Sequence, residues 1–281
     1  IFIFGHLGLP AMGVAGAALA TCIARALEFV LLSWACFSKK GPFCGKWKDF
    51  FSFSWSFVRR IYAAVLPVIL NEGCWGLGFV LYTVAYGKIS TGAISASQIA
   101  NSIQNLFMVV FFSLASASLV MVGNQIGAGL PKRAIRYAHY FTIISLLLGL
   151  ILGIIVFAAA PFLLTFFEVS AEVAQATVNM LRIFAFIAPI RVLNVALIVG
   201  VFRGGGDASY ALKLEASTMW LIGVPLAFLG AMAFHLSVEQ VVLLTTVEEI
   251  IKFGFCMRRL KNRKWVHDMT GHFKIAHSAA E

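Results

Sequence analysis

The sequence predicts an all-α integral membrane protein with about seven transmembrane helices. Of its 281 residues, 60% are hydrophobic and 12% are charged, whereas about 25% of an ordinary soluble domain is charged. The mean hydropathy is +0.91. A globule of this size has too little interior to bury so much apolar surface, so lipid must surround part of it.

The apolar residues form seven runs that approach or exceed the roughly 20 residues needed to cross a bilayer. They cover residues 11–37, 61–86, 92–120, 138–160, 177–202, 212–234 and 237–258. The third run is expected to end before Gly123, because further glycines and Pro131 follow it. In the fourth, Gly149 and Gly153 form a GxxxG pattern, which predicts close packing against another helix.

The first and the last of these runs contain charged residues that lie close together. Arg25 and Glu28 lie three residues apart in the first run, where they can pair with each other. Glu248, Glu249 and Lys252 lie in the final turns of the last run, close to the membrane surface, where we expect a structural role.

The basic residues are strongly biased to one side of the predicted membrane. Eighteen of the 22 Lys and Arg residues fall in the connections on one side or after residue 251, and the opposite side carries Lys88. The positive-inside rule therefore places the 38–60 connection and the basic tail 259–281 in the cytoplasm. The net charge of +10 reflects this bias, and we expect no nucleic-acid partner.

The connection 38–60 mixes aromatic residues with lysines, which is typical of a helix lying in the membrane interface. Two interpretations of this connection remain open: a hinge between two bundles, or a surface helix that only faces lipid. The chain begins with Ile and has no basic region before its first apolar run, so we expect it to be a fragment. The five cysteines show no CxxC spacing, and no catalytic or metal-binding motif is present, so neither an enzyme nor a bound cofactor is expected.

The second run contains the most informative polar site. One helical face carries a carboxylate and four aromatic rings: Glu72, Trp75, Phe79, Tyr82 and Tyr86. Asn71 adjoins the carboxylate. A carboxylate beside aromatic faces suits an organic cation and equally suits H⁺ or Na⁺ as a coupling ion. The alternative is an aromatic packing stripe whose two tyrosines lie at the membrane interface.

Two other runs add polar residues at membrane depth. Gln98, Asn101 and Asn105 share one face of the third run, where they either line a polar cavity or form interhelical hydrogen bonds. Arg191 and Asn194 lie near the middle of the fifth run. An arginine at this depth needs a partner. Because Glu72 lies at a similar depth on an oppositely directed helix, we expect it to share a cavity with Arg191 and to pair with it.

An internal similarity suggests a repeated bundle. Residues 19–29 can be aligned with residues 243–253 at an offset of 224 residues. Such an offset corresponds to about six spans with their loops and fits a transporter made of two six-helix halves. RGGGD, at 203–207, predicts a tight turn at a helix end.

Several segments, in order, resemble the multidrug and toxic compound extrusion (MATE) family. They are GLPAMGVAGAALAT (8–21), LPVILNEGCWGLG (66–78), LVMVGNQIGAGLPKRA (119–134), FRGGGDASY (202–210) and RRLKNRKW (258–265). The resemblance covers nearly the whole chain. It implies that the chain holds the sixth to twelfth helices of a twelve-helix exporter with two lobes, and that Glu72 falls in the helix where some members place a cation-binding acid.

On this resemblance, residues 1–37 are the last helix of the N-terminal lobe with its outer loop, and 61–258 form the C-terminal six-helix lobe. The implied function is export of organic cations or drugs across the cell membrane in exchange for H⁺ or Na⁺. The implied partners are membrane lipid and the N-terminal lobe of the same polypeptide. Two alternatives remain open: a lipid-linked precursor flippase of the same superfamily, and a seven-helix membrane receptor.

Overall fold

The computed structural model describes residues 2, 5, 10–38 and 54–267. These residues are folded into helices joined by short connections, and the chain divides into two compact units, 1–61 and 62–281. Most of the predicted interfacial connection 38–60 and the last part of the predicted tail lie outside the described residues.

The first unit contains α1, Gly13–Ser38. Most of its side chains are exposed, including its large apolar residues. The predicted pairing of Arg25 with Glu28 is confirmed, with a nitrogen–oxygen distance of 2.6 Å. The pair lets two charged side chains compensate each other on an otherwise apolar helix.

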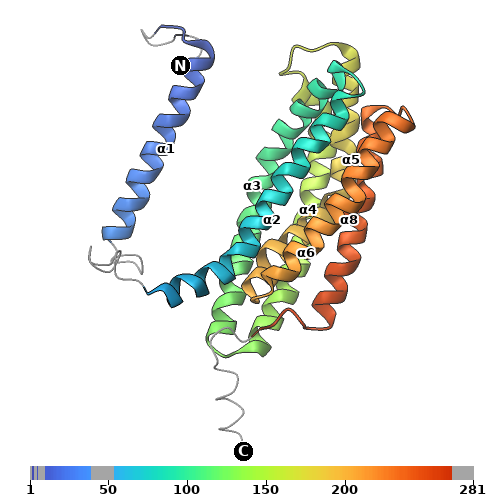
Figure 1. The fold of residues 1–281 in the computed structure, drawn as a ribbon. Helices are drawn as coiled ribbons and strands as arrows, with labels where there is room; N and C mark the ends of the chain where they lie inside the picture. The colour runs from blue at the N-terminus through green and yellow to red at the C-terminus, as the bar shows by residue number, and fades with distance from the viewer. Residues whose placement is uncertain (1, 3–4, 6–9, 39–53, 268–281) are drawn as a thin grey trace, which may run out of the picture. The chain divides into compact units, whose positions relative to one another are not determined.

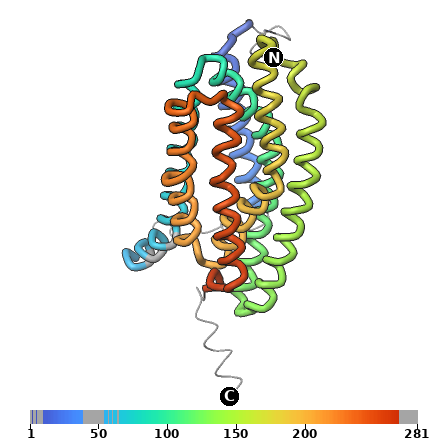
Figure 2. The backbone as a smooth tube through the Cα atoms, turned by 90° about the vertical axis from the view of Figure 1, so that its right-hand side faces the viewer, coloured from blue at the N-terminus to red at the C-terminus, as the bar shows by residue number. Residues whose placement is uncertain are grey.

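The second unit is a bundle of long helices (Figures 1 and 2). Its continuous helices are α2 Trp55–Gly87, which begins in the first unit, α3 Thr91–Gly127, α4 Pro131–Leu164, α5 Ala171–Val195 and α8 Val238–Lys261. A π-helical segment, η1 Ala196–Phe202, extends α5. The remaining helix consists of four pieces, α6 Ala208–Thr218, η2 Met219–Gly223, α7 Val224–Phe228 and η3 Leu229–Ala233.

Six helical runs among the described residues are long and apolar enough to span a membrane. They are Gly13–Ser38, Ile61–Gly87, Thr91–Gly127, Pro131–Leu164, Ala171–Phe202 and Ala208–Ala233. The charged helix α8 is not among them, but its 24 residues extend for about 36 Å, and it packs against α5 and α7. The predicted all-α membrane fold is therefore confirmed, with α8 as the seventh long element.

The third predicted span ends earlier than the helix α3 in the structure. We expected it to stop before Gly123, whereas α3 continues to Gly127. Gly123 lies inside α3 and does not end it, and a Cβ there would make only an ordinary contact, 3.5 Å from the Gly204 carbonyl oxygen. The chain turns only at Gly129, whose φ of 72° is in the left-handed region.

The predicted close packing of the GxxxG helix is confirmed. A Cβ on Gly149 would lie 2.6 Å from Cα of Pro189, and one on Gly153 would lie 2.5 Å from the carbonyl oxygen of Ala185. Both neighbours belong to the backbone of α5. Two glycines one turn apart therefore bring α4 and α5 into direct backbone contact.

The RGGGD turn between η1 and α6 requires each of its glycines for a different reason. A Cβ on Gly204 would lie 2.7 Å from the Leu119 carbonyl oxygen of α3, and one on Gly205 would overlap Trp265. Gly206 has a φ of 83°, which L side chains rarely adopt. The segment after α8 packs against this turn. Trp265 is fully buried, and the His267 amide donates to the Gly205 carbonyl at 2.9 Å.

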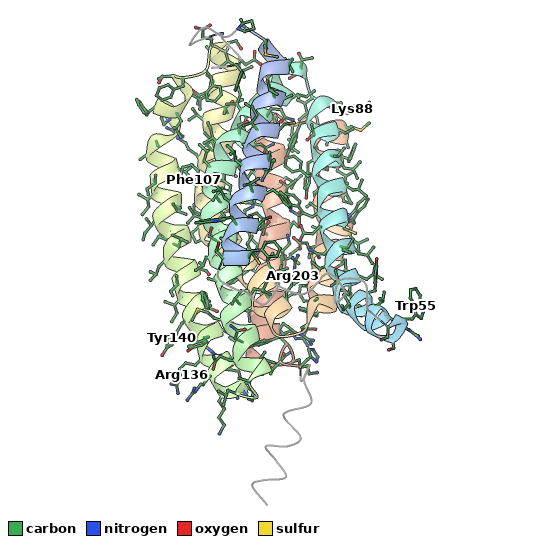
Figure 3. All side chains as sticks on the ribbon, turned by 90° about the vertical axis from the view of Figure 1, so that its left-hand side faces the viewer. Trp55, Lys88, Phe107, Arg136, Tyr140 and Arg203 are labelled. Carbon is green, nitrogen blue, oxygen red and sulfur yellow. The ribbon has the colours of Figure 1, made fainter. Side chains whose placement is uncertain are left out.

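Basic connections lie at one end of the bundle. Figure 3 shows Arg136 at the end where α3 turns into α4, and Lys88 at the opposite end of α2. The RGGGD turn and the end of α8 lie at the Arg136 end, because η1 and α8 run in the direction of α3. The charge bias seen in the sequence is thus a bias between the two ends of the bundle.

Helix α2 is attached to the bundle in an unusual way. Its backbone comes close to that of the other described helices at few points. Near its last turn, Ala85 packs in a small apolar cluster with Ala227 and Val241. Along the middle of α2, Met219 packs against Gly78, and polar side chains make further contacts that lead into the charged interior of the bundle.

Candidate functional site: a charged cavity inside the bundle

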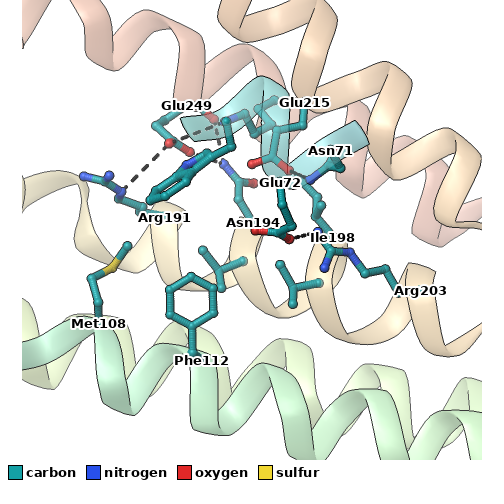
Figure 4. Close-up of a pocket in the computed structure, with 14 residues that line it drawn as sticks. Asn71, Glu72, Met108, Phe112, Arg191, Asn194, Ile198, Arg203, Glu215 and Glu249 are labelled. Atoms are coloured by element: carbon teal, nitrogen blue, oxygen red, sulfur yellow. Dashed lines mark hydrogen bonds and ion pairs between the residues drawn. The ribbon is translucent and has the colours of Figure 1, made fainter. Parts of the chain in front are cut away.

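A small cavity lies among α2, α3, α5, η1, α6 and α8 (Figure 4). Its lining combines carboxylates, amides and cations with a few apolar side chains. The polar and charged members are Asn71, Glu72, Arg191, Asn194, Arg203, Glu215, Glu249 and Lys252. The volume is about 60 Å³, which suits an ion with its waters, whereas drug-sized ligands occupy pockets of roughly 300 Å³ or more.

Two buried amides each hold one carboxylate. Asn71 Nδ2 donates to Glu215 Oε2 at 2.6 Å, and Asn194 Nδ2 donates to Glu249 Oε2 at 2.8 Å. These bonds orient both amides, because only the nitrogen can donate to a carboxylate. The Oδ1 atoms of both asparagines are buried and accept no hydrogen bond from the described residues. Each of these two cavity-lining asparagines therefore has one buried oxygen without a hydrogen bond from the described residues.

A lysine lies among the carboxylates of α8. Lys252 Nζ is 2.9 Å from Glu248 Oε1 and 3.6 Å from Glu249 Oε1. The Lys252 and Glu248 side chains are only 7% and 6% exposed. Tyr82 of α2 donates to the other oxygen of Glu248 at 2.5 Å. Gly223 makes room for this contact, since a Cβ there would overlap both the hydroxyl and the carboxylate.

Arg191 and Glu72 line the same cavity but do not pair with each other, so the predicted pair is wrong. Arg191 Nε lies 3.9 Å from Glu249 Oε1, and its guanidinium also reaches Gln104 at 3.5 Å. Glu72 instead pairs with Arg203 at 2.8 Å. The sequence placed Glu72 and Arg191 at similar depth, but the rotation of α2 directs Glu72 toward the RGGGD turn.

Irregular helix geometry accompanies the cavity. The π-helical segment η1 begins two residues after Asn194 and supplies Ile198 and Val199 to the lining. A second π-helical segment, η2, begins four residues after Glu215. π-helical turns are rare and are often found at functional sites. Here they widen the two helices that carry an amide and a carboxylate of the cavity.

A second cavity of about 130 Å³ adjoins the first and shares Trp75, Arg191, Glu249 and Lys252 with it. It is more aromatic. Trp75 and Phe79 stack with ring centroids 5.9 Å apart, and Tyr82 and Tyr86 also line it. The aromatic face predicted on α2 therefore borders a cavity over part of its length, while Trp75 and Phe79 remain more than one third exposed.

The amides predicted on α3 divide into two groups. Asn101 lines the second cavity, together with Gln104. Gln98 and Asn105 are exposed and line neither cavity. Each residue turns the helix by about 100°, so Asn105 lies roughly 70° and Gln98 roughly 90° from the direction defined by Asn101, Gln104 and Met108. The side of α3 that faces the cavity therefore differs from the predicted face, which included Gln98 and Asn105.

The sequence interpretation missed Glu215 and misjudged the charges of α8. We expected Glu248, Glu249 and Lys252 near the membrane surface, but α8 continues nine residues beyond Lys252, or about 14 Å. Glu215 lies eight residues into the run that begins at Ala208. Placing charge at membrane depth is costly. For this reason the sequence alone could have indicated Glu215, Glu248, Glu249 and Lys252 as functional candidates.

The interior charges do not cancel. Three carboxylates, those of Glu215, Glu248 and Glu249, lie with two cations, Arg191 and Lys252, around the two joined cavities. The Glu72–Arg203 pair is neutral by itself. With all five groups ionised, the formal charge of the cluster is −1. Among the described residues, no three acidic, histidine or cysteine side chains converge closely enough to hold a metal ion.

The fold and the cavity define a class of protein: a multi-pass membrane helix bundle whose ionisable groups face an internal cavity, as they do in transporters. The MatE family profile matches residues 67–229, more than half of the chain. The chain belongs to the MatE family, the multidrug and toxic compound extrusion family that its motifs resemble. This is a family of transporters rather than enzymes, and the membership argues against the seven-helix receptor.

Curated relatives agree with this assignment. A probable multidrug resistance protein NorM of Agrobacterium fabrum is 30% identical over 247 residues, covering 84% of this chain and 51% of the relative. A probable multidrug resistance protein NorM of Bacillus subtilis is 28% identical and covers 82% and 51%. The chain thus spans about half the length of the curated relatives it matches.

Solved structures share the fold. A crystal structure of MATE in complex with MaL6 superimposes with a TM-score of 0.76 at 19% identity, covering 92% of this chain and 59% of that chain. A MOP superfamily transporter from Pyrococcus furiosus gives a TM-score of 0.67 at 18% identity and covers 74% and 46%. At this level of identity the comparison shows the arrangement of helices alone.

Proposed function

We propose that this chain is part of a secondary active multidrug exporter, which expels organic cations or related toxic compounds in exchange for H⁺ or Na⁺. Residues 61–258 form the C-terminal lobe in this proposal, and 1–37 are the last helix of an N-terminal lobe in the same polypeptide. The lobes alternate access around a shared path. The relatives named as multidrug resistance proteins support the export function.

The observation that carries the proposal is the formal charge of −1 around the two cavities, counted with all five groups ionised, beside two asparagines whose buried oxygens accept no hydrogen bond from the described residues. An uncompensated negative charge inside the bilayer is costly, and one monovalent cation neutralises it. A proton can bind a carboxylate directly. Na⁺ is a hard cation that prefers oxygen ligands, which Asn71, Asn194 and the adjacent carboxylates supply. No cofactor is needed for either ion.

Cation binding would also release α2. Three hydrogen bonds between side chains hold the middle of this helix, Asn71 to Glu215, Tyr82 to Glu248 and Arg203 to Glu72. Trp220 also donates to the Cys74 carbonyl at 3.3 Å. A cation that neutralises Glu215 or Glu248 weakens the hydrogen bond which that carboxylate accepts. Because α2 makes few close backbone contacts elsewhere, the loss of these bonds favours a different position of the helix. Binding energy would thereby shift the protein between two states.

The substrate would bind outside the small charged cavity. The aromatic residues Trp75 and Phe79 are exposed beside it and offer ring faces to an organic cation. The basic end of the bundle, with the RGGGD turn and the C-terminus, faces the cytoplasm in this proposal, as the positive-inside rule requires. The protein would reside in the cell membrane, with lipid around its exposed apolar helices.

The test is efflux of an organic cation dye from cells that lack their own exporters and express the complete gene. Wild type is compared with Glu215→Gln and Glu249→Gln under an imposed H⁺ or Na⁺ gradient. Glu172→Gln, an exposed acid at the Lys88 end, is the matched control. We expect gradient-driven efflux that both cavity variants lose and the control retains. Wild-type cells without efflux, or cavity variants as active as wild type, would contradict the proposal.

A further inference from the structure

A groove near the RGGGD turn, at the basic end of the bundle, is separate from the two charged cavities. Its volume is about 340 Å³, within the range of roughly 300–1,000 Å³ that small-molecule pockets occupy. Its apolar wall is formed by Ala63, Pro67, Val68 and Leu119 of α2 and α3. Arg203 is the only charged side chain among the described residues that line it. The groove therefore combines an apolar wall with one positive charge.

Arg203 has hydrogen-bonding capacity that its ion pair does not use. One terminal nitrogen lies 2.8 Å from Glu72 Oε1, and the arginine side chain is 11% exposed. A guanidinium carries several N–H donors, and among the described residues no other acceptor receives one from Arg203. Because the Glu72 side chain is 58% exposed, water competes for its carboxylate and the pair holds the arginine only weakly. A second anion could therefore bind the same guanidinium.

Backbone N–H groups beside the groove are also open. Ala208 and Ser209, in the first turn of α6, line the groove, and their N–H groups make no backbone hydrogen bond within the described part of the chain. Asp207 occupies the N-cap position without capping the helix, because its carboxylate is paired with Arg259 at 2.7 Å. The start of a helix favours anions. It adds to the positive potential that Arg203 creates in the groove.

We infer that this groove binds an anionic phospholipid, whose phosphate accepts hydrogen bonds from Arg203 and from the start of α6 while an acyl chain covers the apolar wall. Arginine and phosphate form strong, often bidentate pairs. Basic pockets between membrane-spanning helices on the cytoplasmic side bind such headgroups, and this end faces the cytoplasm in the proposed function. No described acidic side chain lines the groove, so the cation of a zwitterionic headgroup finds no matching charge there.

Lipid binding would also act on α2. The phosphate competes with Glu72 for the guanidinium of Arg203, and the bond from Arg203 to Glu72 is one of those that hold the middle of α2. An anionic lipid would thus loosen this helix from the RGGGD turn. The groove is in this way a regulatory lipid site that lies outside the charged cavities.

The experiment measures Tm of the purified full-length protein in detergent micelles that contain either dioleoylphosphatidylglycerol or dioleoylphosphatidylcholine. The two lipids have the same acyl chains and differ in the charge of the headgroup. A ligand that binds the folded state raises Tm. We expect phosphatidylglycerol to raise the wild-type Tm above its value in phosphatidylcholine by on the order of a few degrees. Inorganic phosphate, added to the phosphatidylcholine micelles at constant ionic strength, should not do so because it has no acyl chain.

Two variants break the same ion pair but should change the lipid response in opposite directions. Glu72→Gln leaves the guanidinium free, so a larger rise in Tm is expected, whereas Arg203→Gln should lose the rise. Arg136→Gln removes an exposed arginine at the same end of the bundle and should respond as wild type (Figure 3). If Arg203→Gln does not fold, Ala63→Phe narrows the groove with Arg203 in place and should also lose the response.

The inference is overturned if wild type has the same Tm in both lipids, or if Arg203→Gln or Ala63→Phe keeps the response. The same follows if Glu72→Gln lowers it, or if Arg136→Gln abolishes it, because the latter would show that any arginine at this end suffices. An equal rise with inorganic phosphate would indicate a free-anion site instead of a lipid site. None of these measurements depends on transport, so failure of the proposed function, seen in dye efflux, is distinguishable.

Discussion

Two nitrogens of Arg259, Nε and one terminal nitrogen, lie 2.7 Å from the same Oδ2 atom of Asp207. Asp207 is buried at the end of the RGGGD turn, and Arg259 is near the end of α8. The guanidinium also lies 4.4 Å from the ring centroid of Tyr210. This contact joins the start of α6 to the end of α8, two elements that carry Glu215 and Lys252.

Arg259→Gln should therefore destabilise the bundle. It leaves a buried carboxylate with only the weaker His267 contact at 3.4 Å, and we expect a loss of roughly 2–4 kcal/mol in the free energy of unfolding. Thermal unfolding in detergent measures it. Arg258→Gln changes the exposed neighbour on the same helix and should stay within about 0.5 kcal/mol of wild type. Equal effects of the two variants would show that the Asp207 contact contributes nothing specific.

Alanine at the glycines of α4 should separate α4 from α5. The Cβ of Gly149→Ala or Gly153→Ala would meet backbone atoms, which cannot move aside. We expect each variant to lose about 1–3 kcal/mol of stability, measured by thermal unfolding. Gly254→Ala in α8 meets no atom within 4 Å and should gain up to about 1 kcal/mol from helix propensity. A Gly149 variant as stable as wild type would argue against backbone contact.

Removing the hydroxyl of Tyr82 should weaken the attachment of α2. Tyr82→Phe keeps the ring but loses the bond to Glu248, and the carboxylate then lacks one of its two partners. A bond to a charged group contributes roughly 1.5–3 kcal/mol, so a decrease in Tm is expected. Tyr62→Phe, at an exposed tyrosine of the same helix, is the control. The expectation fails if both variants unfold at the wild-type temperature.

Glu72 and Glu215 should differ in their effect on efflux, although both line the cavity. The Glu72 side chain is 58% exposed, so its pair with Arg203 should contribute less than about 1 kcal/mol. We expect Glu72→Gln to retain most dye efflux and Glu215→Gln to lose it by on the order of tenfold. The reverse order, with normal membrane expression of both variants, would move cation coupling to Glu72.

A double-mutant cycle of Glu72→Gln and Arg203→Gln isolates the pair itself. The two single variants and the double variant are compared by thermal unfolding in detergent. We expect a coupling energy below about 1 kcal/mol, because solvent screens an exposed pair. A coupling of roughly 3 kcal/mol would indicate that the pair is buried and stabilising.

Local properties of the sequence were sufficient to predict the membrane fold. Hydropathy and run length are local properties, so they defined the spans from α1 to the α6–η3 run, and the distribution of basic residues indicated two different ends. The GxxxG pattern correctly predicted close packing of α4, because small side chains have that effect wherever a partner lies. Glu72, Asn71, Arg191 and Asn194 were placed in one interior because charged and amide groups rarely face lipid.

Which of these groups contact each other depends on how the helices pack. The partner of Glu72 is 131 residues away and that of Asn71 is 144 residues away, and neither distance leaves a periodic signal. The choice depends on the rotation of each helix, which excluded Gln98 and Asn105 from the cavities, and on where helices end, which placed Lys252 inside the bundle. Spacing fixes which residues share a face, but packing against neighbouring helices decides what that face contacts.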